Sequence, residues 1–219
     1  PDPTLRTGYM QQFNFNVQQQ VSGALAIQAG YVGRTGRKLM LALPSNPALY
    51  APGATLGNIN QRRLMPGFGN NRVISAQANS HFHSLQVEVT RRFSRGFSLQ
   101  AAYTFSRSID QASGITTGLG TAAPNIFDLR AQYGLSDFHA KHIGSASWVW
   151  ELPRTRYQNG VLDVLLHNWQ VNGLVALRTG RPINVLSGRD DALSGTQNQR
   201  PNVIGEHRLS DDRSRDGEP

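Results

Sequence analysis

The chain has 219 residues, 38% of them hydrophobic and none of them cysteine, which excludes a disordered polymer, a disulfide framework, a zinc-thiolate site and a cysteine nucleophile. The net charge is +8, but lysine occurs only at Lys38 and Lys141 and no basic run is present, so nucleic acid is not an expected partner. No stretch approaches the roughly 18 to 20 uninterrupted apolar residues of a transmembrane helix, whereas a transmembrane β-barrel stays open because its strands alternate apolar and polar residues.

Alternation of this kind predicts six β-strands, each about as long as a membrane-crossing barrel strand. The first two, at 9–21 and 24–34, flank Ser22-Gly23, and glycine suits a tight turn because it accepts positive φ. One face of the first strand is apolar and the other carries amides: Phe13, Phe15 and Val17 against Asn14, Asn16 and Gln18.

The third and fourth strands, at 82–93 and 97–108, flank the short turn 94–96. The third shows the clearest alternation, with Leu85, Val87, Val89 and Phe93 opposed to Ser84, Gln86, Glu88, Thr90 and Arg92. Such a polar face does not suit a soluble core, which indicates that it meets water.

The fifth and sixth strands are predicted at 143–152 and 169–185. Pro182 cannot donate a ladder hydrogen bond, so the sixth strand is expected to be irregular there and to resume over 183–185. Between these strands, one side of a short amphipathic helix is expected from Val161, Leu162, Leu165 and Leu166.

The connections alternate short and long. Segments 22–23 and 94–96 are tight and 153–168 is intermediate, whereas 35–81, 109–141 and 186–219 are long and polar, as is typical of short periplasmic turns and long external loops. The predicted fold class is therefore all-β, an antiparallel up-and-down meander that forms a partial transmembrane β-barrel over 1–185, followed by a truncated external loop over 186–219. Six strands are fewer than the eight or so of the smallest barrels, and no signal peptide is visible, so an internal segment of a larger outer-membrane protein is expected.

Aromatic residues recur at similar positions in the predicted strands. Residues 25–31 (LAIQAGY) echo 97–103 (FSLQAAY), and each copy follows a glycine-containing turn. Tyrosine and tryptophan favour the membrane interface, so a girdle is predicted from Tyr31, Tyr103, Phe105, Trp148, Trp150 and Trp169. The alternative is that these rings belong to an ordinary β core.

Several stretches, in order, carry a likeness to a known family: 66–69 (PGFG), 79–87 (NSHFHSLQV), 92–97 (RFSRGF), 103–110 (YTFSRSID), 135–138 (LSDF) with His142, 169–173 (WQVNG) and 179–183 (TGRPI). Together they resemble the barrel region of Oar-like TonB-dependent receptors of the acidobacterial type. The resemblance implies a 22-stranded barrel closed by an N-terminal plug, which imports a substrate with energy from the inner-membrane TonB complex. The plug and the TonB-contacting segment have no counterpart in this sequence, and no substrate-binding residue is carried over.

Sites of other kinds receive weaker support. His81 and His83 share a strand face but lack a third ligand, and Asp190-Asp191 and Asp211-Asp212 lack the spacing of a calcium loop, so solvated charge is expected. Glu88 and Glu151 are expected to line the lumen. No catalytic motif is present, so neither enzymatic activity nor a cofactor or metal is expected.

Two further expectations concern partners. Lipopolysaccharide phosphates are predicted partners of residues where strands leave the outer leaflet: Arg34, Arg37, Lys38 and Arg107. A rival interpretation of the whole pattern is a soluble extracellular β-rich binding or adhesin module, in which the apolar faces pack against one another.

Overall fold

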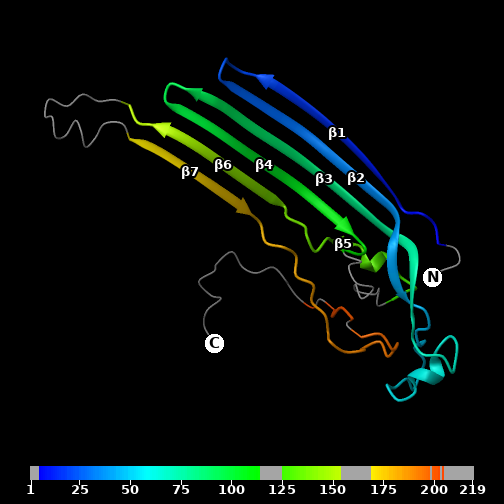
Figure 1. Ribbon diagram of the computed structural model, residues 1–219. Helices are drawn as coiled ribbons and strands as arrows, with labels where there is room; N and C mark the ends of the chain where they lie inside the picture. The colour runs from blue at the N-terminus through cyan, green and yellow to red at the C-terminus, as the bar shows by residue number, and fades with distance from the viewer. Residues whose placement is uncertain (1–4, 114–124, 154–168, 198, 203, 205–219) are drawn as a thin grey trace, which may run out of the picture. The chain divides into compact units, whose positions relative to one another are not determined.

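The computed structural model describes residues 5–113, 125–153, 169–197, 199–202 and 204 (Figure 1). The chain divides into two compact units. We call Pro1–Ser45 with Asn71–Ile183 the sheet unit, and Asn46–Asn70 with Asn184–Pro219 the loop unit.

The sheet unit is one antiparallel β-sheet in which neighbours along the chain are neighbours in space (Figure 1). Its order is β1-β2-β3-β4-β6-β7, with the short β5 paired to β4. The strands are β1 Tyr9–Gln20, β2 Leu25–Pro44, β3 Arg72–Ser94, β4 Phe97–Asp110, β5 Gly134–Leu135, β6 His142–Glu151 and β7 Gln170–Arg178. The predicted all-β antiparallel meander is confirmed, and the sheet is not closed between β1 and β7.

Tight turns join β1 to β2 and β3 to β4 at the same end of the sheet. In the second turn, Arg95 and Gly96 have φ of 54° and 75°, as in the type I′ turn whose twist matches a two-residue hairpin. A Cβ at Gly96 would also lie 3.1 Å from the Glu151 carbonyl oxygen. We call this the turn end, and the opposite end, where 45–71 and 111–141 connect strands, the loop end.

Two predicted strand boundaries are wrong at the loop end, because β2 continues to Pro44 and β3 begins at Arg72. Much of the predicted loop 35–81 is therefore a paired extension of this hairpin. The register shifts between Gly36 and Leu39, where Lys38 has a φ of 54°. This bulge interrupts the alternation that marks a strand in the sequence.

The sixth predicted strand is shorter than expected. β7 ends at Arg178 and no strand resumes over 183–185. Pairing extends only to Thr179, whose amide donates to the His142 carbonyl oxygen at 3.0 Å. Beyond that point the neighbouring chain no longer follows β7, since the Ala140 carbonyl oxygen accepts from the Ser106 hydroxyl of β4 instead. The helix predicted near 161–166 lies outside the described residues.

The sheet has very little apolar core. Across the described ranges, the buried hydrophobic residues are Leu41, Ala48, Ala78 and Ala140. Leu41 and Ala78 pack with Leu39, Leu43, Ala112 and Leu129 on the hairpin extension at the loop end. Along the rest of the strands large side chains stay exposed, Phe15 at 69% and Leu177 at 68%. No second apolar layer covers them in the part of the chain that the structure describes.

The loop unit joins two segments that are distant in sequence. The Ala48 amide donates to the Ser194 carbonyl oxygen at 2.8 Å, and the short 3-10 helix Ile59–Arg62 places Arg62 Nη2 2.8 Å from the Leu193 carbonyl oxygen. Asn46 is only 1% exposed, and its amide nitrogen donates to the carbonyl oxygens of Met65 and Phe68. Hydrogen bonds from side chains therefore organise this unit.

Candidate functional site

The register of the strands collects the apolar residues on one face. Val89 of β3 lies opposite Ile27 of β2 and Ala101 of β4, and Ala101 lies opposite Ala146 of β6. Two further rows cross the sheet in the same way. One contains Val17, Ala29, Val87, Tyr103, Gly144 and Leu177. The other contains Leu25, Arg91, Leu99, Trp148 and Gly173. This apolar face is continuous over six strands, with Gln19 and Arg91 as polar interruptions near the turn end.

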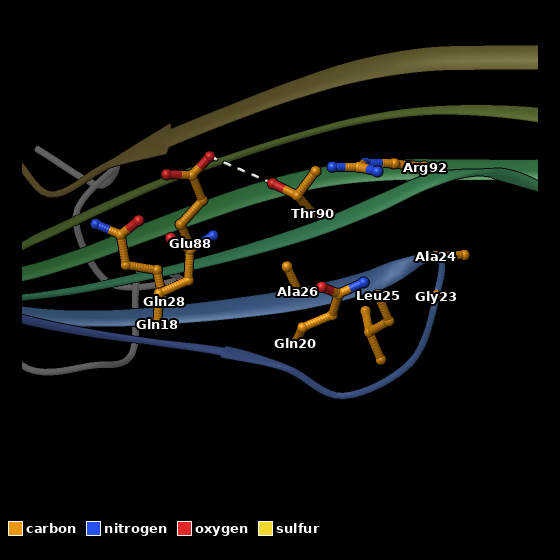
Figure 2. A pocket seen from close by; sticks show the side chains of 10 residues that line it. All are labelled: Gln18, Gln20, Gly23, Ala24, Leu25, Ala26, Gln28, Glu88, Thr90 and Arg92. Carbon is orange, nitrogen blue, oxygen red and sulfur yellow. Dashed lines mark hydrogen bonds between the residues drawn. The ribbon is translucent and has the colours of Figure 1, made fainter.

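The opposite face carries mainly amides, hydroxyls and a few charges. Gln18, Gln28 and Glu88 form one row, and Figure 2 shows their side chains on the same side of the sheet, beside a hollow at the turn end. Glu88 accepts long hydrogen bonds of 3.4 Å from Thr90 and Gln100. Ile143, Val149 and Leu174 interrupt this polar face on β6 and β7. Glu88 lies on β3 and Glu151 on β6, so the two predicted lumen residues share this face from separate strands.

The predicted girdle residues fall into two groups along the apolar face. Trp148 and Trp150 lie near the turn end, as does Trp169 just before β7, whereas Tyr31, Tyr103 and Phe105 lie toward the loop end. Phe97 faces Trp150 and, eight residues along β4, Phe105 faces His142. At about 3.3 Å per residue and a tilt of about 40°, this spacing corresponds to about 20 Å along a membrane normal, close to the roughly 25 Å apolar band of a barrel.

Histidines meet tyrosines where the apolar face approaches the loop end. The Tyr31 hydroxyl shares a 2.6 Å hydrogen bond with His83 Nδ1, and the Tyr103 hydroxyl shares one of the same length with His142 Nδ1. His81 is bonded in the same way to Tyr133. Among the described residues, no group of three His, Asp or Glu is placed to hold a metal ion. Sequence spacing missed these pairs because Tyr31 and His83 are brought together only by strand register.

The four cationic residues predicted at the loop end do not share one face. Arg107 is exposed and lies opposite His83 on the apolar face. Arg34 pairs with Gln12 and Phe82 and lies on the polar face. Arg37 and Lys38 sit in the bulge, where Arg37 donates to Asn79 at 3.4 Å and the Lys38 ammonium lies 5.8 Å from the Tyr9 ring centroid.

A bulge between β5 and β6 covers part of the polar face. Residues 136–141 leave the regular ladder with β4, although their ends, Ser136 and Lys141, keep backbone hydrogen bonds to Ser108 and Ser106. The Ser106 hydroxyl donates to the Ala140 carbonyl oxygen at 2.7 Å. The Ser108 amide donates to His139 Nδ1 at 3.2 Å, and Arg178 donates to the Phe138 carbonyl oxygen at 3.4 Å. Burial, with the positive charges of Arg107 and Lys141, lowers the pKa of His139. A neutral imidazole that accepts from Ser108 therefore holds the bulge.

Acidic residues of the loop unit organise its backbone. Asp190 accepts from the amides of Ser194 and Gly195 at 2.9 and 2.6 Å and from the Gln199 side chain at 3.0 Å. Asp191 lies 3.7 Å from Arg189 in an exposed ion pair. Asp190 is thus a structural residue and not only the solvated charge predicted from the sequence, while 211–212 lie outside the described residues.

A single-layer antiparallel sheet with a wide exposed apolar face and a hydrophilic opposite face has the organisation of a transmembrane β-barrel wall. The chain belongs to the family described as outer membrane beta barrel domain, whose sequence model matches residues 1–217. No curated protein and no solved structure matches the chain. The protein is therefore an outer-membrane barrel protein whose wall associates with outer-membrane lipids. Within the described ranges, no helix has the length and apolarity needed to cross a membrane.

Proposed function

We propose that this chain forms part of the barrel wall of a TonB-dependent active transporter that imports a substrate across the outer membrane. The observation that carries the proposal is the continuous apolar face, which six strands expose without a second layer of side chains in the described chain. Apolar surface of this extent is stable against lipid, and the amide-rich face suits an aqueous interior. The ordered stretches that resemble Oar-like receptors support the transporter class.

Spin labels along β3 test the wall. Because the chain has no cysteine, Gln86→Cys, Val87→Cys, Glu88→Cys and Val89→Cys variants of the intact protein can each be labelled at one site. Labels at 87 and 89 should collide with oxygen dissolved in lipid, and labels at 86 and 88 with a water-soluble nickel chelate. A soluble module with a packed core would instead shield positions 87 and 89 from both reagents.

TonB dependence is tested separately. The intact protein, extracted from outer membranes in mild detergent, should be retained on an immobilised periplasmic domain of TonB. A barrel that works without TonB would pass through such a column while keeping the alternating spin-label pattern. The two experiments therefore separate the class of transporter from the architecture of the wall.

The long connections are proposed to lie outside the cell and the turn end in the periplasm. Short periplasmic turns and long external loops are the usual arrangement of such barrels, and the two-residue turn at Arg95 and Gly96 fits the periplasmic side. Tyr31, Tyr103 and Phe105 then belong to the outer interface, and Trp148, Trp150 and Trp169 to the inner one. Arg107, Arg37 and Lys38 lie near lipopolysaccharide phosphates in this orientation, while Arg34, on the polar face, borders the interior.

A further inference from the structure

Two tyrosine-histidine pairs with the same geometry recur on separate strand pairs. Tyr31 of β2 lies opposite Leu85, and its partner His83 is two residues from Leu85 toward the loop end. Tyr103 of β4 lies opposite Gly144, and its partner His142 is displaced in the same direction. The ring centroids are 6.1 Å apart in both pairs. The repeated geometry includes the two tyrosines of the internal sequence echo, so both copies place a Tyr-His pair at the border of the apolar face.

Among the described residues, each pair leaves one polar hydrogen without a protein acceptor. A neutral tyrosine and a neutral imidazole together carry two, one O–H and one N–H, and the hydrogen bond between them uses one. When the tyrosine donates to Nδ1, the other imidazole nitrogen keeps its hydrogen; when Nδ1 donates, the tyrosine hydroxyl keeps its own. Either tautomer therefore offers one donor to an acceptor outside the protein.

Positive charge accompanies these donors. Arg107 lies directly opposite His83 on the apolar face and is exposed, and the described residues provide it with no carboxylate partner. Lys141 precedes His142, and its ammonium lies 6.0 Å from the Phe105 ring centroid. A ligand that suits donors and cations at the edge of a hydrocarbon layer is a lipid phosphate, which guanidinium binds in bidentate fashion.

We propose that Tyr31, His83, Tyr103, His142 and Arg107, here called the Tyr-His belt, bind phosphate groups of lipopolysaccharide in the outer leaflet. The inference rests on the orientation given under the proposed function. The aromatic rings lie against acyl chains while the free donors and Arg107 meet the headgroup. Glycerophospholipid phosphates have the same chemistry but fill the inner leaflet, so they are the alternative source that the test must separate.

The test uses the intact protein extracted from outer membranes in mild detergent, with bound lipopolysaccharide counted by native mass spectrometry. The triple variant His83→Leu/His142→Leu/Arg107→Gln should lose most of the lipopolysaccharide that co-purifies with the parent protein. Arg107→Gln alone should weaken binding in nanodiscs about fivefold, which corresponds to about 1 kcal/mol per cation near an anionic lipid surface. Tyr31→Phe/Tyr103→Phe should have a smaller effect, since the imidazoles and Arg107 remain.

The matched control is Arg91→Gln. Arg91 lies on the same apolar face near the turn end, where it stacks 5.2 Å from the Phe97 ring centroid, so its loss should leave bound lipopolysaccharide unchanged. Lipopolysaccharide stripped of its lipid A phosphates should bind the parent protein no better than it binds the triple variant.

Three outcomes would overturn the proposal. Lipopolysaccharide retained by a triple variant with normal heat-modifiable migration would show that the belt does not bind it. If the triple variant lost bound phosphatidylglycerol and kept lipopolysaccharide, the belt would lie in the inner leaflet. If only the Arg91→Gln variant lost lipopolysaccharide, the turn end and not the loop end would lie in the outer leaflet. The alternating spin-label pattern of the wall would still hold in that case.

Discussion

The sheet unit and the loop unit are stabilised in different ways. In the sheet unit, backbone ladders join β1, β2, β3, β4, β6 and β7, and most side chains along them face outward from a single layer. In the loop unit, Asn46, Arg62 and Asp190 satisfy backbone groups that no regular ladder pairs. A side chain of the sheet therefore has to match the medium it meets, whereas a side chain of the loop unit has to match particular neighbouring atoms.

This difference predicts where each unit is sensitive to substitution. On the sheet, polarity at a given face decides the outcome and many residues of the right class are tolerated. In the loop unit, one amide or guanidinium with several partners cannot be exchanged without leaving buried polar groups unpaired. The variants below go from the largest expected effect to the smallest.

A charged side chain introduced on the apolar face should reduce the stability of the protein most. Val89 sits in the middle row of that face, between Ile27 and Ala101, so Val89→Arg should destabilise the barrel by about 2 to 4 kcal/mol. The adjacent control Thr90→Arg projects to the polar face and should cost much less. Urea unfolding of the intact protein in lipid bilayers measures both. Equal costs at the two positions would mean that the faces do not meet different media.

Loss of the buried Asn46 amide should reduce stability less, and only that of the loop unit. Asn46→Ala leaves the carbonyl oxygens of Met65 and Phe68 and the Met65 amide without their side-chain partner, at about 1 to 3 kcal/mol. Protease added to intact cells should cut the 50–58 segment about fivefold faster or more, because local opening becomes easier.

Gln61→Ala is the control for this loop variant, since Gln61 is exposed in the 3-10 helix Ile59–Arg62 of the same unit. The urea transition of the sheet should be unchanged in both variants. A sheet that loses as much stability as the loop unit upon Asn46→Ala would show that the two units are one cooperative structure.

The smallest effect concerns the bulge at 136–141 and depends on pH. The pKa of His139 lies below its ordinary value of about 6.5 because the imidazole is buried near Arg107 and Lys141. As the pH falls below about 6.5, the opened form binds a proton before the closed form does, so the bulge loses stability until the lowered pKa is reached. Its full stability is present above that window.

Hydrogen exchange at the Ser108 amide, corrected for its intrinsic pH dependence, reports this loss because that amide donates to His139. Protection should decline as the pH drops below about 6.5, and His139→Gln should remove the step. The effect should be modest, since Ser106, Ser108 and Arg178 also bond to the bulge. Protection that rises on acidification would contradict the assigned direction of the pKa.

Much of the sheet could be predicted because alternation depends only on the local sequence. Leu85 to Val89 alternate without interruption, and their faces follow from that pattern. The extension of β2 to Pro44 was missed because the bulge at Arg37 and Lys38 breaks the period of two. The end of β7 was misplaced because it depends on the path of β6, which no local pattern in 169–185 reports.

The candidate sites were harder to predict, because they depend on register between distant strands. His81 and His83 were expected to share a face, but the tyrosines that bond to them come from outside their own strand. The sequence predicts the same role for Arg34 and Arg107, yet they occupy opposite faces. Asn46 belongs to no motif, and only its carbonyl partners, 19 and 22 residues away, reveal its role.

The left-handed residue at Lys38 inverts the phase of the side chains along β2. Between Gly36 and Leu39, two residues of β2 oppose Asn79 alone on β3. Leu39 and Leu41 therefore lie on the side of the sheet that even-numbered residues occupy between Leu25 and Gly36. When the alternation of apolar and polar residues is averaged over the whole of β2, the two halves have opposite phases and the period-two signal cancels. Deleting Lys38 would remove the extra residue and restore one uninterrupted alternation, in which the Leu41 side chain, now 1% exposed, keeps the side of the wall that it occupies.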